Sequence, residues 1–220
     1  MREDFVSGWP HGGLYVAGQQ VLSLYSRKLA YIERPRQEQA SVCRATGTCI
    51  PAPICAKKNS MADARFDMAV ELYRKAYQLQ MQGELELAVS LYKRSIDLHP
   101  TAEAYTFLGW TYRFQGKLDQ AIVECKKAIA IDPNFGNPYN DIGAYLIEKG
   151  KFDDAIPWLE EATRAPRYEA YHYPWFNLGR VYFAKDMYTR AKECWQKALE
   201  IEPDYAPAKE SLGKLKRMLQ

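Results

Sequence analysis

The sequence has few of the residues that carry most enzymatic chemistry, with three histidines and five cysteines among 220 residues. His11, His99 and His172 lie near the terminus or in expected turns, and no Ser-His-Asp, His-x-x-x-His or phosphate-loop pattern occurs. The acidic pairs Asp153-Asp154 and Glu160-Glu161 fit the start and the solvated side of a helix better than acid–base catalysis. We therefore expect a protein that is not an enzyme and uses no cofactor.

Long hydrophobic runs are also missing: none approaches the ~18–20 apolar residues that a membrane-spanning helix requires. The first residues, MREDFVSGWPHGG, lack the basic start and apolar core of a secretory signal. An odd number of cysteines in such a chain favours reduced thiols. We expect a cytoplasmic protein without membrane insertion, a location assigned by default.

Three of the cysteines, Cys43, Cys49 and Cys55, are regularly spaced in the first 60 residues. Zinc sites pair cysteines at shorter spacing and need four ligands, and the fourth ligand here would be as distant as His11. We therefore expect no metal site. Cys125 and Cys194 fall in expected helices, where we expect them to pack as small apolar residues.

Charge divides the chain into two parts. Residues 1–60 hold eight Lys and Arg against four Asp and Glu, whereas residues 61–220 hold 22 against 23. A nearly neutral main part argues against nucleic acid as its partner.

Residues 1–60 differ from the rest in pattern too. A weak helical periodicity runs from Leu14 to Ile32 and is followed by a stretch rich in Pro, Ala, Thr and basic residues without a period. Such a composition predicts a poorly ordered extension, because it buries too little apolar surface to offset its ordering entropy. A clean helical sequence opens at Met61, which leads to the hypothesis that Met61 is the true translation start. We accordingly divide the chain into residues 1–60 and 61–220.

The main part repeats itself with a period of 33 to 36 residues, the strongest signal in the sequence. Small residues recur in three series that share one register: Ala76, Gly109, Gly143 and Gly179; Ala88, Ala121, Ala155 and Ala191; Ser95, Ala128, Ala162 and Ala198. Small residues on facing helices allow the helix axes to approach to about 8–10 Å. Each unit therefore predicts a pair of packed helices.

Helix-ending residues recur in the same register. Gly83, Gly116 and Gly150 fall where the first helix of a pair ends, and glycine adopts the left-handed conformation there most easily. The fourth unit has Asp186 at this point, which tolerates that conformation less well. Pro100, Pro133 and Pro203 follow the second helices and cannot continue them.

The fourth unit reads W-x2-L-G-x2-Y…A-x3-W…P from Trp175 to Pro203, and this pattern resembles the tetratricopeptide repeat family. The resemblance implies an all-α fold, a right-handed α-solenoid of helix-turn-helix units with a C-terminal capping helix. We place the units near residues 69–101, 102–135, 136–171 and 172–205, and the cap at 206–220. Lys209 and Lys216 give the cap a polar outer face. A two-residue insertion in TRAPRYEAYHY is expected to bulge the turn after the third unit.

The family implies a concave groove lined by unit positions 2, 5, 9, 12 and 13 of the first helices, and a protein or peptide partner held there. Carried over to this sequence, the predicted partner-binding residues are Tyr73, Tyr77, Trp110, Arg113, Phe114, Asn140, Tyr173, Phe176, Arg180 and Phe183. Aromatic side chains would anchor a peptide, Asn140 would hold its backbone, and the arginines would meet carboxylates. The competing interpretation is that several aromatics belong to the core between units or are covered by the N-terminal segment.

The resemblance leaves several functions open, with a scaffold or adaptor preferred. A cytosolic co-chaperone that grips a C-terminal carboxylate is disfavoured, because Tyr73, Tyr77, Asn137 and Asp141 stand where such members carry Lys, Asn or Arg. A pilus- or envelope-assembly factor is the other alternative, although neither Cys43 nor Cys49 follows the apolar run that a lipidated cysteine needs. The sequence leaves the partner's identity and the oligomeric state open.

Overall fold

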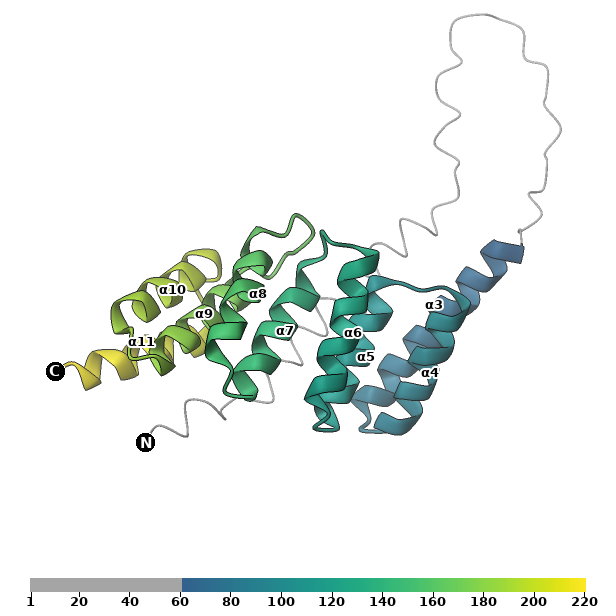
Figure 1. Cartoon of the computed structure of the whole chain (residues 1–220), viewed down its shortest axis with the longest axis horizontal. Coiled ribbons are helices and arrows are strands. Elements are labelled where there is room, and N and C mark those ends of the chain that lie inside the picture. Colours follow the sequence, from purple (N-terminus) through teal and green to yellow (C-terminus); the bar gives the residue numbers. More distant parts are fainter. Residues whose placement is uncertain (1–60) are drawn as a thin grey trace, which may run out of the picture. The chain divides into compact units, whose positions relative to one another are not determined.

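The structure, a computed structural model, describes residues 61–220 as a row of nine α-helices without a β-strand (Figure 1). The helices are α3 (Met61–Met81), α4 (Leu85–Leu98), α5 (Ala102–Phe114), α6 (Leu118–Ile131), α7 (Gly136–Glu148), α8 (Phe152–Arg164), α9 (His172–Ala184), α10 (Tyr188–Ile201) and α11 (Ala206–Met218). The expectations for residues 1–60, including the three cysteines and the alternative start at Met61, lie outside the described residues. Among the helices described, none is both long and apolar enough to cross a membrane.

Consecutive helices pair as hairpins, α3 with α4, α5 with α6, α7 with α8 and α9 with α10, and each hairpin packs against the first helix of the next. The first helices also touch one another along the row, α3 with α5, α5 with α7 and α7 with α9. The predicted all-α solenoid is confirmed. We call the surface formed by α3, α5, α7 and α9 the first-helix face.

The small residues of the register lie where hairpin helices cross. Ala88, Ala121, Ala155 and Ala191 are fully buried, and so are Ala128, Ala162 and Ala198. A Cβ placed on Gly143 would lie 2.4 Å from Leu159, a distance that no real contact shows. Any larger residue at position 143 would therefore require the buried Leu159 side chain to move at this approach of α7 to α8. Cys125 and Cys194 are buried free thiols, as predicted.

The turns within the hairpins have the conformation that their residues predict. Gly83, Gly116 and Gly150 have φ of +86°, +74° and +70°. Asp186 takes the same place in the fourth hairpin with φ of +59°, and it accepts a 2.6 Å hydrogen bond from the Tyr188 hydroxyl. The aspartate therefore adopts the left-handed turn, at a cost that glycine avoids.

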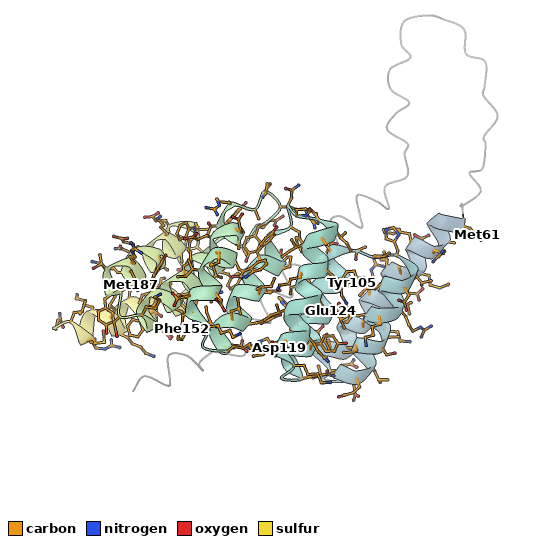
Figure 2. All side chains as sticks on the ribbon, viewed as in Figure 1. Met61, Tyr105, Asp119, Glu124, Phe152 and Met187 are labelled. Atoms are coloured by element: carbon orange, nitrogen blue, oxygen red, sulfur yellow. The ribbon has the colours of Figure 1, made fainter. Side chains whose placement is uncertain are left out.

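Polar contacts between hairpins follow the period as well. Lys149 pairs with Asp119, which lies at the start of α6 (Figure 2), and Lys185 pairs with Asp153 one repeat further on. The equivalent residue in the second hairpin is Gln115, whose Nε2 donates to Glu86 at 3.5 Å. The residue that follows the first helix of each of these three hairpins thus contacts the preceding hairpin.

The two-residue insertion lies in the linker between α8 and α9 and pairs with the linker between α6 and α7. The Arg167 N–H donates to the Asn134 carbonyl at 2.9 Å, and the Gly136 N–H donates to the Arg167 carbonyl at 3.1 Å. The Arg167 guanidinium contacts Glu103 at 2.6 Å and Asp132 at 2.8 Å, and it lies over the Phe135 ring at 4.1 Å. The insertion therefore ties α5 and both linkers together, which the expected bulge did not anticipate.

Candidate functional site

The candidate site is the first-helix face, and the structure places all ten predicted residues on its helices. Tyr73 and Tyr77 lie on α3; Trp110, Arg113 and Phe114 on α5; Asn140 on α7; Tyr173, Phe176, Arg180 and Phe183 on α9. Their exposure differs. Phe114 is 44% exposed, Arg113, Phe176 and Phe183 are half-buried, and the other six are buried. Their part in binding a partner stays a prediction.

At the N-terminal end of the face, aromatic rings pack between the first two hairpins around Phe107. Its ring lies edge-on to Tyr73 at 5.4 Å and to Tyr77 at 5.6 Å between centroids, and 5.1 Å from Trp110. Such edge-on pairs contribute about 0.5–1.5 kcal/mol beyond the area that they bury. Phe107 was not among the predicted residues, and it joins three of them into one cluster.

A second aromatic cluster lies at the other end, where α9 meets the start of α11. The Tyr205 ring packs edge-on against Tyr173 at 5.6 Å, Phe176 at 5.2 Å and His172 at 4.8 Å. Burial raises the pKa of Tyr205 and lowers that of His172. Sequence reasoning missed Tyr205 because it precedes the capping helix and occupies none of the first-helix positions used for the prediction.

Between the clusters, polar side chains bridge the third and fourth hairpins. The Asn177 Nδ2 donates to the Asn140 Oδ1 at 3.0 Å, and the Arg180 Nη1 donates to the Asn177 Oδ1 at 3.1 Å. The amide oxygen of Asn140, expected to hold a peptide backbone, thus accepts a hydrogen bond within the chain.

The second and third hairpins are bridged by two further polar pairs. The Trp110 indole N–H donates to the Asp141 Oδ2 at 2.5 Å, and the Arg113 Nε donates to the Glu148 Oε1 at 2.8 Å. Arg113 also lies over the Phe114 ring at 5.7 Å. Arg113, whose charge acts on Asp141, is therefore paired with a different carboxylate, that of Glu148.

Asp141 has a strongly perturbed acidity on this face. Burial raises the pKa of its carboxyl to about 7, against the opposing effects of the Trp110 hydrogen bond, the Arg113 charge and a hydrogen bond with Asn140. Cys125 and Tyr145 lie close enough that the charge of Asp141 also raises their pKa values. A carboxyl that takes up a proton near neutral pH thus lies between two hairpins.

Phe107, Asp141 and Asn177 occupy one position in the period, the sixth of their units. The groove prediction used positions 2, 5, 9, 12 and 13, and sequence reasoning considered position 6 only at Asp141, in weighing the co-chaperone. Phe107 contacts Tyr77 and Asp141 binds Trp110, and both of those residues hold position 9 of the preceding unit. Position 6 therefore mediates contact with the hairpin before it. The period itself was the signal that could have identified Phe107 and Asn177.

No group of three or more potential metal ligands occurs within residues 61–220. The first-helix face instead offers part-exposed aromatic rings, amides and charged groups, which suit non-covalent recognition of a polypeptide.

Comparison with known proteins agrees with this architecture. Residues 102–135 and 172–205 match the tetratricopeptide repeat model TPR_1, and residues 124–156 match a second tetratricopeptide repeat model. The chain is a tetratricopeptide repeat protein. The sequence resemblance to this family is thereby confirmed.

Two curated relatives illustrate how widely such repeats occur. The chain is 26% identical over 121 residues to the type IV pilus assembly protein PilF of Pseudomonas aeruginosa, covering 54% of this chain and 48% of that protein. It is 26% identical over 174 residues to the human protein O-mannosyl-transferase TMTC1, covering 70% of this chain and 20% of the relative. The chain thus spans between a fifth and about half of the length of these relatives.

Solved structures show the same fold. The Pseudomonas aeruginosa PilF structure has a TM-score of 0.65 at 22% identity, with 69% of each chain covered. The first repeat domain of Spaghetti (RPAP3), bound to the HSP90 peptide SRMEEVD, has a TM-score of 0.50 at 26% identity, covering 54% of this chain and 93% of that one.

Proposed function

We propose that the repeat array is a non-catalytic scaffold in the cytoplasm that holds a segment of a partner protein on its first-helix face. The observation that carries the proposal is the row of part-exposed aromatic side chains on this face, Phe114, Phe176 and Phe183. Aromatic residues that remain accessible on a preformed surface are the usual anchors of protein interfaces. The peptide bound to the RPAP3 repeat domain supports the same mode of action.

The face is held in place before any partner arrives. Hydrogen bonds join Trp110 to Asp141 and Asn140 to Asn177 across hairpin boundaries. A surface whose side chains are already fixed loses little conformational entropy on binding. A scaffold of this kind needs no reactive group, which agrees with the sparse histidines and with the burial of Cys125 and Cys194 among the described residues.

The test compares two exposed apolar residues that lie on different helices of one hairpin. Phe114 is 44% exposed at the end of α5, and Val123 is 50% exposed on α6, the second helix. We expect Phe114→Glu to lose proteins that the wild-type chain captures from native extract, and Val123→Glu to retain them. Equal capture by both variants would show that the first-helix face is not the binding surface.

Changes at Trp110 or Arg180 are less suitable, because both side chains are buried and hydrogen-bonded within the array. Truncating Trp110 would remove the indole donor from the Asp141 carboxyl and lower the stability of the fold. Phe114 avoids this ambiguity because its side chain is largely exposed.

A pilus- or envelope-assembly factor is the second candidate, and the similarity to PilF favours it. Fractionation of the native protein distinguishes the candidates. Recovery with membranes would support the assembly factor, whereas recovery in the soluble fraction would support the cytoplasmic scaffold.

A co-chaperone that grips an acidic C-terminus is less well supported. Asp141 stands where such a protein needs a cation, and its carboxyl would repel the terminal carboxylate whenever it is ionised. Absence of binding to the peptide SRMEEVD in a direct titration would agree with this assignment.

A further inference from the structure

Asp141 is a buried carboxyl at the boundary between the second and third hairpins. The residue is 6% exposed, and no salt bridge within residues 61–220 includes it. Trp110 donates to it from α5, and a hydrogen bond with Asn140 also favours its charged form. Both partners are neutral, so they offset only part of the cost of desolvating a carboxylate. The proton on this carboxyl therefore decides whether the boundary holds an incompletely compensated charge.

The equivalent residue differs in chemistry at each boundary. Position 6 is Phe107 between the first and second hairpins, Asp141 between the second and third, and Asn177 between the third and fourth. Phenylalanine and asparagine keep their charge at every pH, whereas aspartate ionises. Of these three boundary contacts, the one made by Asp141 is therefore the one that responds to pH.

A second polar contact lies beside the first on the same two helices. Arg113 follows Trp110 by three residues on α5, and Glu148 follows Asp141 by seven on α7, spacings that keep each pair on one helix face. The Arg113 Nε donates to the Glu148 Oε1 at 2.8 Å, and the guanidinium lies over the Phe114 ring at 5.7 Å. Its charge also acts on Asp141. One arginine thus lies in the field of two carboxylates and is paired with the second.

The Tyr145 hydroxyl is a spare donor between these contacts. Tyr145 is 2% exposed, and its hydroxyl has no hydrogen-bond partner among the described residues. The charges of Asp141, Arg113 and Glu148 all act on it. A carboxylate accepts a hydrogen bond more strongly than a neutral carboxyl does, so this donor favours an ionised neighbour.

The titratable and charged side chains around Asp141 are Arg113 on α5, Cys125 on α6, Tyr145 and Glu148 on α7, Tyr168 in the linker before α9, and Arg180 on α9, which faces Glu148. The contact of α8 with α7 at Gly143 is made by the apolar Leu159. Burial raises the pKa values of Cys125, Tyr145 and Tyr168 well above their ordinary values, so these groups stay protonated at neutral pH. Asp141 is therefore the member of this set whose burial brings its proton loss close to neutral pH.

From this arrangement we propose that Asp141 and Arg113 form a proton-operated switch that regulates the first-helix face. While Asp141 is protonated, Arg113 stays paired with Glu148. Once Asp141 has lost its proton, the new carboxylate draws the Arg113 guanidinium and the Tyr145 hydroxyl towards itself. Glu148 then loses its pair, and the Phe114 ring loses the cation above it.

The inference rests on the proposed function, because Phe114 is the exposed aromatic anchor of that proposal. Burial raises the pKa of Asp141 to about 7, so the carboxyl is mostly protonated at pH 6 and mostly ionised at pH 8. If the protonated form is the one that binds, the competent fraction falls from about nine tenths to about one tenth between these pH values. The apparent affinity for a partner should then fall up to about tenfold.

The test follows the fluorine resonances of the full chain, labelled with 4-fluorophenylalanine, from pH 5 to pH 8.5. The resonance of Phe114 is identified by its loss in Phe114→Leu, and it should shift with a single midpoint near pH 7 in the wild type. This shift should be absent in Asp141→Asn, which has no proton to lose, and in Arg113→Gln, which lacks the side chain that moves. Phe152, at the start of α8, is the internal control and should not follow this midpoint.

The outcomes are distinct. A Phe114 resonance without a midpoint between pH 6 and pH 8 in the wild type would overturn the switch, whatever the variants do. A midpoint that persists in Asp141→Asn would assign the titration to another group, and one that persists in Arg113→Gln would show that Arg113 does not move. Either result also overturns the switch.

Regulation of binding is measured separately, by capture from native extract at pH 6 and pH 8. The wild type should retain less of its partner at pH 8, whereas Asp141→Asn should retain similar amounts at both pH values. An equal loss in both chains would overturn the regulation. The scaffold itself fails only if Phe114→Glu captures the same proteins as the wild type, and the fluorine titration does not depend on that result.

Discussion

The Trp195 indole lies against Gly179 so closely that a Cβ placed on Gly179 would be 2.3 Å from the indole Nε1. Trp195 is fully buried, and its N–H donates to the Phe176 carbonyl at 3.2 Å. The ring therefore has little room to shift, and the contact fixes how α9 crosses α10.

We expect Gly179→Ala to destabilise the array despite the better helix propensity of alanine. Overpacking costs about 1–3 kcal/mol, and replacing a helical glycine returns at most ~1 kcal/mol, so a net loss of up to about 2 kcal/mol is expected. Urea unfolding followed by far-ultraviolet circular dichroism measures this change.

Gly213 supplies the matched control, because it holds the same register position in α11. Among the described residues, only Arg217 Nη1, at 3.6 Å, comes within 4 Å of a Cβ placed there. Gly213→Ala should therefore stabilise the array by up to ~1 kcal/mol. Destabilisation of similar size by both substitutions would contradict the packing argument.

The turn at Asp186 offers a stabilising substitution. Asp186 has φ of +59°, and glycine takes this conformation without steric cost, so Asp186→Gly should raise the free energy of unfolding by roughly 0.5–1 kcal/mol. Loss of the Tyr188 hydrogen bond offsets part of the gain. Gly150→Ala, at the same turn position one hairpin earlier, should have the opposite sign. Thermal unfolding of both variants and the wild type measures these changes in stability. A lower melting temperature for Asp186→Gly, or a higher one for Gly150→Ala, would contradict the argument.

The fold was predictable from the sequence because the residues that define it act locally and repeat. Each hairpin needs a small residue at its crossing and a turn residue that tolerates positive φ, and both recur at the period. Gly143 and Gly150 show this directly: the first allows contact with Leu159, and the second reverses the chain.

The site was less predictable because its residues act between hairpins. The groove positions of the family predicted that Trp110 and Asn140 contact a bound peptide. In the structure, both instead form hydrogen bonds with the next hairpin, Trp110 with Asp141 and Asn140 with Asn177. Which side chain meets which across a repeat boundary depends on pairs of residues about 31 to 37 positions apart, and no local pattern encodes such pairs. Arg167 is a similar case, since its contact with Glu103 spans 64 positions.

Arg167 itself gives a prediction about coupling along the array. Arg167→Gln removes the pairs with Glu103 and Asp132, and the partly buried first pair makes a loss of about 1–2 kcal/mol the expected result. Arg164→Gln is the control, because Arg164 pairs with Glu161 within α8 where both are exposed, and such a pair contributes little. If hydrogen exchange in α5 and α7 is equally slow in both variants, the linker does not couple the hairpins.

The buried carboxyl of Asp141 predicts a pH dependence of stability with a definite sign. Because burial raises its pKa from 3.8 to about 7, the folded chain holds a proton between these values that the unfolded chain has lost. The stabilisation from this group is therefore complete below about pH 4, and it decreases as pH rises to about 7. Asparagine cannot ionise and still accepts from Trp110, so Asp141→Asn should be free of this loss.

The measurement is the difference in free energy of unfolding between Asp141→Asn and the wild type at pH 5 and pH 8. One pKa unit corresponds to 1.36 kcal/mol, so the advantage of the variant should grow by roughly 2–3 kcal/mol between these pH values. Asp154→Asn, on the exposed first turn of α8, controls for the change in net charge. An advantage of Asp141→Asn that stays constant with pH would show that Asp141 ionises in the array as freely as in the unfolded chain, and one that shrinks as pH rises would show that folding lowers its pKa.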